Sequence, residues 1–510
     1  MPLLIEYRNN ITAWAQHDKE NISTGLQQHG RVRRLVLQAP SPNLRTCLVE
    51  LNEHFPQLEY LSIESTTKVE ASLVLPGTFR APNLRHLAFH DIGLPEQLSL
   101  SASIPALVTL TLTYIPAPCY FHPGHLVTQL QELPFLEELS IGFAVPMPRP
   151  STEGELLHVP IPRVTLPILK RFTFRGVVVY LENLIAQIYT PLLEQLNVTL
   201  FFQLAFTLVN LTQFIHTIER LRCLSASIHF ERNRASIVTS NGESLDGGGL
   251  TISVICMSLD WQIDATTQVC GALAQVLSSI EELTLDLEEA GISFDGENAP
   301  DSTLWRELLL QFTGVRRLHI GSALTSELSD ALTSDGAGLD LELLPDLRDL
   351  EVQLEFGDAH NAFSTFTETR KRAGRLVRLL ASPLPKASSK MSSGPIGQHH
   401  HLSVSTLRHS VTTLYATVLL RLRIQDRPYR FSPFSKERTT TRPLLPHTVP
   451  LDVSSPAVPS TSLGMPFRGR TVRGSDGSHR SGGPRGSRQH SDFSQSIAQS
   501  RKLRRRHGYR

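Results

Sequence analysis

One pattern of apolar and polar positions recurs along residues 32–352. An apolar residue is followed by two polar ones, a second apolar residue, a variable residue and a third apolar residue. A proline often stands two places ahead, as in Pro56-Gln57-Leu58-Glu59-Tyr60-Leu61-Ser62-Ile63. Most steps between the ten copies are 23 to 35 residues, which is the spacing of a structural repeat. Their first apolar residues are Val32, Leu58, Leu84, Leu107, Leu136, Leu169, Leu193, Ile280, Val315 and Leu347.

One step is much longer, because 87 residues separate Leu193 from Ile280. We expect two degenerate copies within it, one near Leu221-Arg222-Cys223-Leu224 and one near Leu250–Leu259.

Each copy predicts a short β-strand, because apolar and variable residues alternate after the second apolar position. The proline ahead of it cannot donate a ladder hydrogen bond, so it belongs before the strand. Between copies the apolar spacing changes to three and four, which predicts helices around Leu44–Phe55, Leu181–Ile188, Leu208–Ile218 and Val269–Ile280. Asp301 is a candidate N-cap for a further helix with Leu304, Leu308 and Phe312.

Each unit is therefore a helix that leads into a strand. No unit can bury its leucine face alone, but stacked units share a continuous core. The pattern predicts an α/β fold in which a parallel sheet lines a curved inner surface and the helices lie outside. The alternative is an ordinary α/β domain whose strands happen to look alike.

The phrase resembles leucine-rich repeats, and its long, irregular spacing is similar to that of the F-box leucine-rich-repeat proteins common in mushroom-forming fungi. Met1–Tyr7 is similar to the strand that usually follows the F-box. Leu259-Asp260-Trp261-Gln262 is similar to a segment of the late repeats, and Phe363–Leu380 more loosely to the final helix and last strand. The resemblance covers about residues 1–381 and implies a leucine-rich-repeat solenoid.

The resemblance also implies a role in protein degradation. In that family the F-box docks on a cullin-type ubiquitin ligase, and the repeats recognise the substrate. The F-box would lie ahead of residue 1, and nothing in this chain matches it. We therefore expect either a truncated or mis-started gene product, or a repeat protein without ligase docking. An adaptor of the ligase is a partner only if an F-box exists upstream.

Charge divides the chain into two parts. Residues 1–381 carry 27 Lys+Arg and 43 Asp+Glu, whereas residues 382–510 carry 22 and 5. After Ala381 the composition shifts to Ser, Pro, Gly, Arg and His, which cannot bury a core. We predict an N-terminal cap region at 1–30, a repeat array at 31–381 and a disordered basic tail at 382–510.

The tail favours an alternative function. It ends in a cluster that is typical of nuclear-import signals and of contacts with phosphate backbones: Arg501, Lys502, Arg504, Arg505 and Arg506. A nuclear or RNA-associated protein is therefore the second hypothesis. Two further interpretations stay open: the tail folds back on the acidic array, or it is translated non-coding sequence.

Candidate catalytic chemistry is sparse. We find no glycine-rich phosphate loop and no serine in a glycine-flanked nucleophile elbow. The sequence contains no run of eighteen apolar residues, so it predicts no membrane-spanning helix. The scattered, odd set of cysteines argues against disulfides or a zinc site and favours a reducing compartment: Cys47, Cys119, Cys223, Cys256 and Cys270. We predict a non-enzymatic cytoplasmic or nuclear protein with no cofactor, metal or membrane contact.

Candidate binding residues follow from the strand alternation, because the variable positions point away from the core. On a curved array they line the inner face, where repeat proteins bind partners. Arg175 alone has the chemistry of an interface hot spot. A merely solvated face is the alternative. The predicted protein-binding residues are Glu64, His90, Thr113, Arg175, Asn197, Asp286, His319 and Glu351.

Overall fold

The computed structural model describes most of the chain up to residue 383. The described residues are 1–9, 16–67, 72–95, 99–146, 163–240, 249–288, 301–333, 343–354 and 362–383. All of them belong to one compact unit, Met1–Ser393. The predicted basic cluster at Arg501–Arg506 lies outside the described residues.

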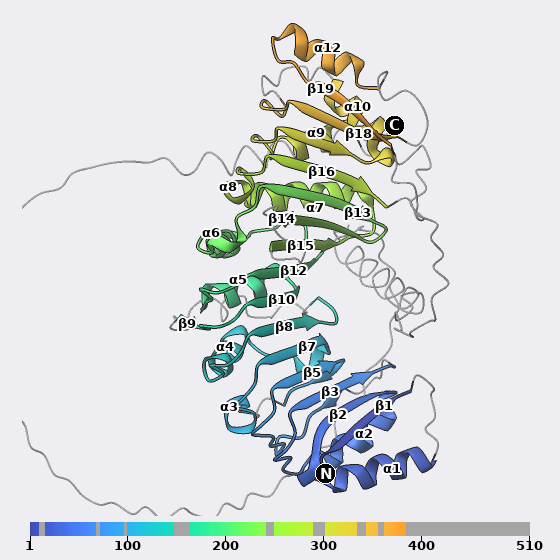
Figure 1. Ribbon diagram of the computed structural model, residues 1–510, viewed down its shortest axis with the longest axis vertical. Coiled ribbons are helices and arrows are strands. Elements are labelled where there is room, and N and C mark those ends of the chain that lie inside the picture. Colours follow the sequence, from blue (N-terminus) through green and yellow to red (C-terminus); the bar gives the residue numbers. More distant parts are fainter. Residues whose placement is uncertain are drawn as a thin grey trace, which may run out of the picture. The chain divides into compact units, whose positions relative to one another are not determined.

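The described strands form a mixed α/β structure around one long, mostly parallel sheet of 15 strands. Their order is β1-β2-β3-β5-β7-β8-β10-β12-β15-β14-β13-β16-β17-β18-β19, which Figure 1 follows from bottom to top. Their bounds are β1 Leu3–Arg8, β2 Val32–Ala39, β3 Tyr60–Ser65, β5 His86–His90, β7 Thr109–Ile115, β8 Glu138–Phe143, β10 Arg171–Gly176, β12 Gln195–Phe201, β13 Ser225–Glu231, β14 Arg234–Ser240, β15 Gly249–Ile255, β16 Glu282–Leu287, β17 Arg317–Ile320, β18 Asp349–Leu354 and β19 Arg378–Pro383. Two short parallel pairs lie outside this sheet: β4 Leu73–Val74 with β6 Ile92–Gly93, and β9 Val164–Thr165 with β11 Ile188–Tyr189.

Helices connect most of the strands. The α-helices are α1 Gln16–Gln27, α2 Ser41–Glu50, α3 Leu100–Ser103, α4 Pro123–Gln131, α5 Val178–Ala186, α6 Val209–His216, α7 Leu259–Ala272, α8 Ala274–Leu277, α9 Ser302–Leu309, α10 Thr325–Thr333 and α12 Ser364–Arg372. Single 3-10 turns are η1 His29–Arg31, η2 Ala117–Cys119, η3 Glu219–Leu221 and η4 Ser322–Leu324.

The predicted helices are confirmed over most of their length. Leu44, Leu181 and Leu211 are fully buried in α2, α5 and α6. The predicted N-cap also holds, because the Asp301 carboxylate accepts a hydrogen bond from the Thr303 backbone N–H at 3.0 Å. This bond satisfies one of the free donors at the start of α9.

The repeated phrase explains the core. In β3 the second and third apolar residues of the phrase, Leu61 and Ile63, are buried, and the alternate residues Ser62 and Glu64 are only half buried. The same alternation recurs in the other strands of the phrase. One face of the sheet therefore carries the core, and the opposite face carries polar side chains.

Aromatic side chains connect the core face to the helices. Tyr180 of α5 packs edge-on against Phe143 of β8, with ring centroids 4.7 Å apart, and stacks on Phe174 of β10 at 5.9 Å. Further along, Trp305 of α9 meets Phe230 of β13 edge-on at 5.3 Å. Such pairs bury a large apolar area, so each of them stabilises a helix on the sheet.

The prediction of an all-parallel sheet is wrong at one place. The long step between Leu193 and Ile280 holds strands at both expected sites, β13 and β15, but β14 lies between them and runs antiparallel to both. β13 and β14 form a hairpin, and Arg234 donates two hydrogen bonds to the Glu231 carboxylate across its turn, at 2.7 and 2.8 Å. The chain then returns so that β15 pairs with β12, and the spatial order of β13 and β15 is reversed.

Candidate partner-binding surface

The face of the sheet opposite the core, here called the open face, carries side chains in rows that cross the strands. The strand register defines a middle row of small residues: Ser62, Ala88, Thr111, Ser140, Thr173, Asn197 and Thr251. A carboxyl-end row lies beside it: Glu64, His90, Thr113, Gly142, Arg175 and Thr199. All eight predicted binding residues lie on this face and are half buried. Their role in binding stays a prediction.

The eight residues fall into two groups. Glu64, His90 and Thr113 are register neighbours on β3, β5 and β7, and Arg175 lies in the same row on β10. Asn197 lies in the middle row beside Thr173. Asp286, His319 and Glu351 are distant from these in the sheet order, on β16, β17 and β18.

A β-bulge in β7 adds a residue that the sequence did not single out. Leu112 pairs with Ile141 and Ile115 with Phe143, so two residues of β7, Thr113 and Tyr114, oppose one residue of β8. Tyr114 has a φ of 54°, which is uncommon for a bulky aromatic residue. The bulge turns the Tyr114 side chain toward the open face, where regular alternation would have turned it toward the core.

Arg175 meets this tyrosine across β8. Its Nη1 donates a hydrogen bond to the Tyr114 hydroxyl at 2.8 Å, and the guanidinium carbon lies 4.5 Å from the Tyr114 ring centroid. On its other side the Phe201 ring centroid is 5.6 Å away. Both rings attract the cation through their π faces, so they fix the position of the guanidinium.

Gly142 lies between the two residues. It occupies the β8 position between Tyr114 and Arg175, and a Cβ placed there would lie 3.4 Å from the Cβ of Arg175, which is an ordinary contact distance.

His90 completes what we call the Arg175 cluster: His90, Tyr114, Arg175 and Phe201. The His90 and Tyr114 ring centroids are 4.5 Å apart, and His90 Nδ1 lies 3.1 Å from the Thr113 hydroxyl. Burial lowers the pKa of His90 below its ordinary value of 6.5; Glu64 opposes the decrease and Arg175 adds to it. The imidazole is therefore neutral near pH 7, and Arg175 carries the positive charge of the cluster.

The side chains of the second group contact polar partners within the chain. His319 Nδ1 lies 3.0 Å from the Glu351 carboxylate, and His229 Nδ1 lies 3.7 Å from that of Asp286. An acidic hollow lies beside this last pair, lined by His229, Phe230, Glu231, Asp286 and Glu288.

A ladder of ion pairs follows the amino ends of the strands. Glu281 and Glu282 are partly exposed and pair with Arg316 and Arg317 at the start of β17. Exposed pairs of this kind contribute little to stability and disfavour wrong strand neighbours. The other pairs are Glu6–Arg34, Glu59–Arg33, Glu137–Lys170, Glu138–Arg171, Glu194–Arg220 and Asp349–Arg378.

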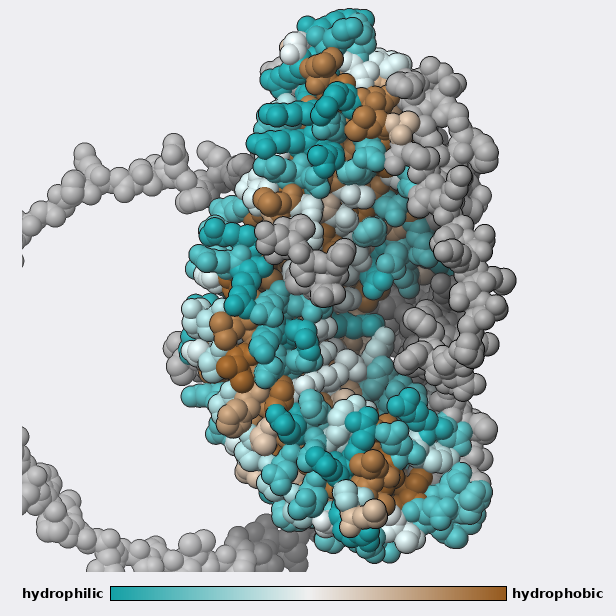
Figure 2. Space-filling model, in the orientation of Figure 1, coloured by the Kyte–Doolittle hydropathy of each residue, from teal (hydrophilic) through white to brown (hydrophobic). Residues whose placement is uncertain are grey.

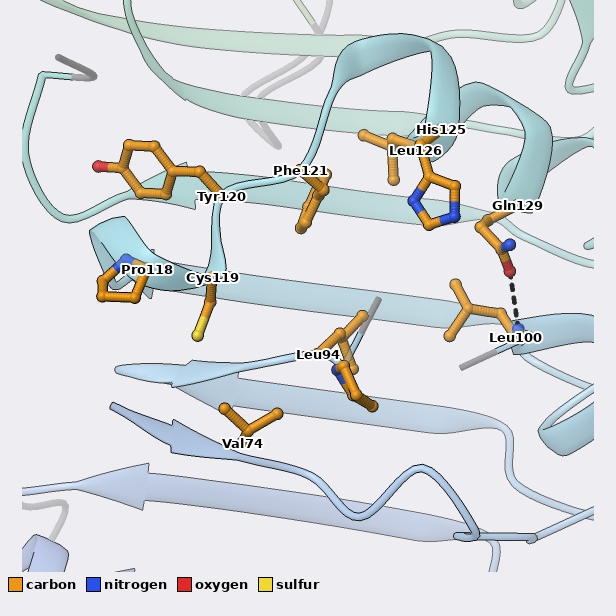
Figure 3. Close-up of a pocket in the computed structure, with 11 residues that line it drawn as sticks. Val74, Leu94, Leu100, Pro118, Cys119, Tyr120, Phe121, His125, Leu126 and Gln129 are labelled. Carbon is orange, nitrogen blue, oxygen red and sulfur yellow. Dashed lines mark hydrogen bonds between the residues drawn. The ribbon is translucent and has the colours of Figure 1, made fainter. Parts of the chain in front are cut away.

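A small apolar pocket of about 290 Å³ lies where η2 and α4 meet the β4–β6 pair (Figure 3). The Cys119 sulfur points toward the short strands and packs on Gly93, where a Cβ would collide with it. Burial raises the pKa of Cys119, so the thiol is not activated. Gln129 accepts a hydrogen bond from the Leu100 backbone N–H at 2.8 Å, so its carbonyl is already occupied. The pocket offers few polar groups that could orient a ligand.

The remaining features considered in the sequence are a buried cysteine, metal-binding groups and membrane-spanning helices. Cys256 is buried, and burial raises its pKa to about 11. Within the described ranges, no three His, Cys, Asp or Glu side chains are grouped so that they could hold a metal ion. The helices of the described part are too short or too polar to cross a membrane. On the surface drawn in Figure 2, hydrophilic residues predominate, and the hydrophobic areas are small and separate.

Neither a known protein family nor a curated protein sequence matches this chain.

Sequence reasoning missed Tyr114 and Phe201. In the sequence Tyr114 continues the apolar alternation of Leu110 and Leu112, so no local signal marked the bulge. Phe201 carries no signal either, since an apolar residue at the end of a strand is ordinary.

Proposed function

We propose that this chain is a leucine-rich-repeat protein that recognises another protein through the open face around Arg175. The recurring leucine phrase and the single long sheet with helices on its core face support a repeat array. Repeat arrays typically bind partners on the face that the strands line. The function is binding, with no reaction assigned to the chain.

The observation that carries the proposal is the strained placement of Tyr114 beside Arg175. A left-handed backbone costs an L-residue about 1–2 kcal/mol, and such strain gathers at functional sites. The strain here places a tyrosine ring next to an arginine on an otherwise small, polar face. Tyrosine and arginine are the residues most enriched in interface hot spots.

Site-specific photo-crosslinking in cells tests this function. A photoreactive amino acid replaces Thr173 in the middle row, and a matched one replaces Gln213, which is exposed on α6. We expect a protein crosslink at Thr173 that is absent at Gln213. Arg175→Glu should remove it, whereas Arg222→Glu, at an exposed arginine before β13, should leave it intact. Crosslinks that survive Arg175→Glu would contradict the proposal.

Two parts of the sequence hypothesis go further than this. Presentation of the bound protein to a cullin-type ubiquitin ligase stays a prediction, as does nuclear or RNA association through the basic tail. Deletion of residues 384–510 separates the two functions: the crosslink at Thr173 should persist if the open face binds the partner, and it should disappear if the tail does.

A further inference from the structure

We propose that the open face recognises a carboxylate on an extended segment of its protein partner, with Arg175 as the group that binds it. The inference rests on the proposed function, because it names the chemistry that the partner must bring to the same surface. It is carried by the Arg175 cluster and by the small polar residues of the middle row.

The charge of Arg175 is not compensated within the described chain. No described carboxylate lies within ion-pair distance of it, and its Nε is buried without a hydrogen-bond partner among the described residues. Five other arginines on the same face have a carboxylate partner: Arg34, Arg171, Arg234, Arg317 and Arg378. Arg8, at the β1 end of the same row, has none among the described residues, but it is exposed and has no aromatic ring beside it. A half-buried cation with an unpaired donor is costly, and an incoming anion removes that cost.

The guanidinium is held ready for an anion. Tyr114 and Phe201 flank it, and the Tyr114 hydroxyl occupies Nη1. Arginine presents its remaining N–H donors as a rigid fork that matches the two oxygens of a carboxylate. Because the side chain is already positioned, binding costs less conformational entropy than it would for a free surface arginine.

The local charge favours a single negative charge over a phosphate. Arg175 is the one full cation of the cluster, since His90 is neutral near pH 7. Glu64 follows His90 in the same row and opposes any further negative charge. Phosphate groups are typically bound by several arginines, which this part of the face does not supply.

The middle row fits an extended segment that crosses the strands. From β7 to β12 there are three steps between neighbouring strands, which is about 14 Å and the length of about four extended residues. Along this path Thr111, Ser140 and Thr173 offer hydroxyls, and Asn197 offers an amide. These groups can donate to and accept from a peptide backbone. The chain's own basic segment, 382–510, has the wrong charge to be this occupant.

Peptide pools with one fixed residue test the inference with the full chain. Each pool holds immobilised, capped heptapeptides with Glu, Asp, Gln or phosphoserine at the centre and uncharged residues elsewhere. A fifth pool has Gln at the centre and a free carboxyl terminus. The measurement is retention of the purified protein and of two variants, Arg175→Gln and Arg234→Gln. Arg234 is the matched control, because it lies on the same face but is already paired with Glu231.

We expect the Glu and Asp pools to retain the protein at least about tenfold better than the capped Gln pool. Arg175→Gln should abolish this preference, and Arg234→Gln should leave it intact. Retention on the free-terminus pool, also dependent on Arg175, supports carboxylate recognition and assigns it to a chain end. If Arg175→Gln does not fold, Arg175→Lys keeps the charge but loses the fork, and the preference should fall at least about threefold.

Three results would overturn the inference: equal retention on the Glu and capped Gln pools, an acidic preference that persists in Arg175→Gln or is undiminished in Arg175→Lys, or stronger retention on phosphoserine than on Glu. The crosslink at Thr173 separates this failure from failure of the proposed function. If the crosslink depends on Arg175 while the pools show no acidic preference, the open face binds a protein but recognises a group other than a carboxylate.

Discussion

The open face handles charge differently in its two regions. In the first region, β3 to β12, the carboxyl-end row holds an arginine without a carboxylate partner, flanked by two aromatic rings. In the second region, β13 to β18, polar side chains contact one another in neighbouring pairs, as in His319 with Glu351 and the ion pair of Arg234 with Glu231. Paired charges satisfy one another and leave little for a ligand, whereas an unpaired one is available to a ligand. The comparison locates recognition in the first region.

Both regions share one kind of core, so the largest expected effects are on stability and do not distinguish them. Phe174→Ala in the first region and Trp305→Ala in the second each remove a fully buried aromatic ring. Each should lower the free energy of unfolding by about 3–5 kcal/mol, because the cavity left behind cannot close. Urea unfolding measures this loss. A cost below about 1 kcal/mol for either variant would show that its ring is not part of a shared core.

Tyr114→Gly separates binding from stability in the first region. Glycine relieves the left-handed backbone at this position, so the loss of the ring should change the free energy of unfolding by less than about 1 kcal/mol. Retention on the acidic peptide pools should nevertheless fall at least about tenfold, because Arg175 loses its flanking ring and hydrogen bond.

Tyr60→Gly is the matched control for this change. Tyr60 also contacts an arginine, with the Arg34 guanidinium 3.8 Å from its ring centroid, but it lies in the regular strand β3. Here glycine should destabilise the fold and leave acidic retention unchanged. If Tyr114→Gly destabilised the fold more than Tyr60→Gly, the left-handed backbone at Tyr114 would not be strained.

The pH dependence of stability should include a contribution from the first region. The pKa of His90 lies below its ordinary 6.5, so the folded state binds this proton less readily than the unfolded state. The free energy of unfolding should therefore decrease as the pH falls below about 6.5 and be retained above it. Burial lowers the pKa of His86 as well, so His90→Asn should remove only part of this dependence. Thermal unfolding between pH 5 and 8 measures it, and an unchanged profile in His90→Asn would argue against the buried histidine.

The smallest effects are expected in the ion-pair ladder. Arg317→Ala removes the partner of Glu282, and both side chains are nearly half exposed. The loss in the free energy of unfolding should be about 0–1 kcal/mol and should shrink further in high salt. Acidic retention should not change, because this charge is already matched. A salt-independent loss above about 2 kcal/mol would mean that the ladder contributes more than exposed pairs do.

Local periodicity predicted much of this structure. Leucine positions, helix positions and the Asp301 cap depend on residues close in sequence, and the structure confirms them. The placement of Arg175 on the open face followed from strand alternation alone. Local patterns were sufficient wherever a unit repeated its neighbour.

Departures from the repeat were not predictable in the same way. The antiparallel β14 forms a hairpin with β13 and also pairs with β15, so that β15, and not β13, lies next to β12. Which strand pairs with β12 depends on contacts between residues far apart in the sequence. Tyr114 reaches Arg175 through a bulge, across the β8 position of Gly142. Contacts between residues 61 positions apart leave no trace in a local pattern.

Cysteine protection tests the contrast between the two regions most directly. Thr199→Cys lies beside Arg175 in the register, and Thr284→Cys lies in the second region; both threonines are half buried on the open face. Maleimide alkylation of each new cysteine is followed by peptide mass spectrometry, with and without the Glu-centred peptide pool in solution. The account predicts that the peptides slow alkylation at position 199 at least about fivefold and leave position 284 unchanged. Equal protection at both positions, or none at 199, would contradict it.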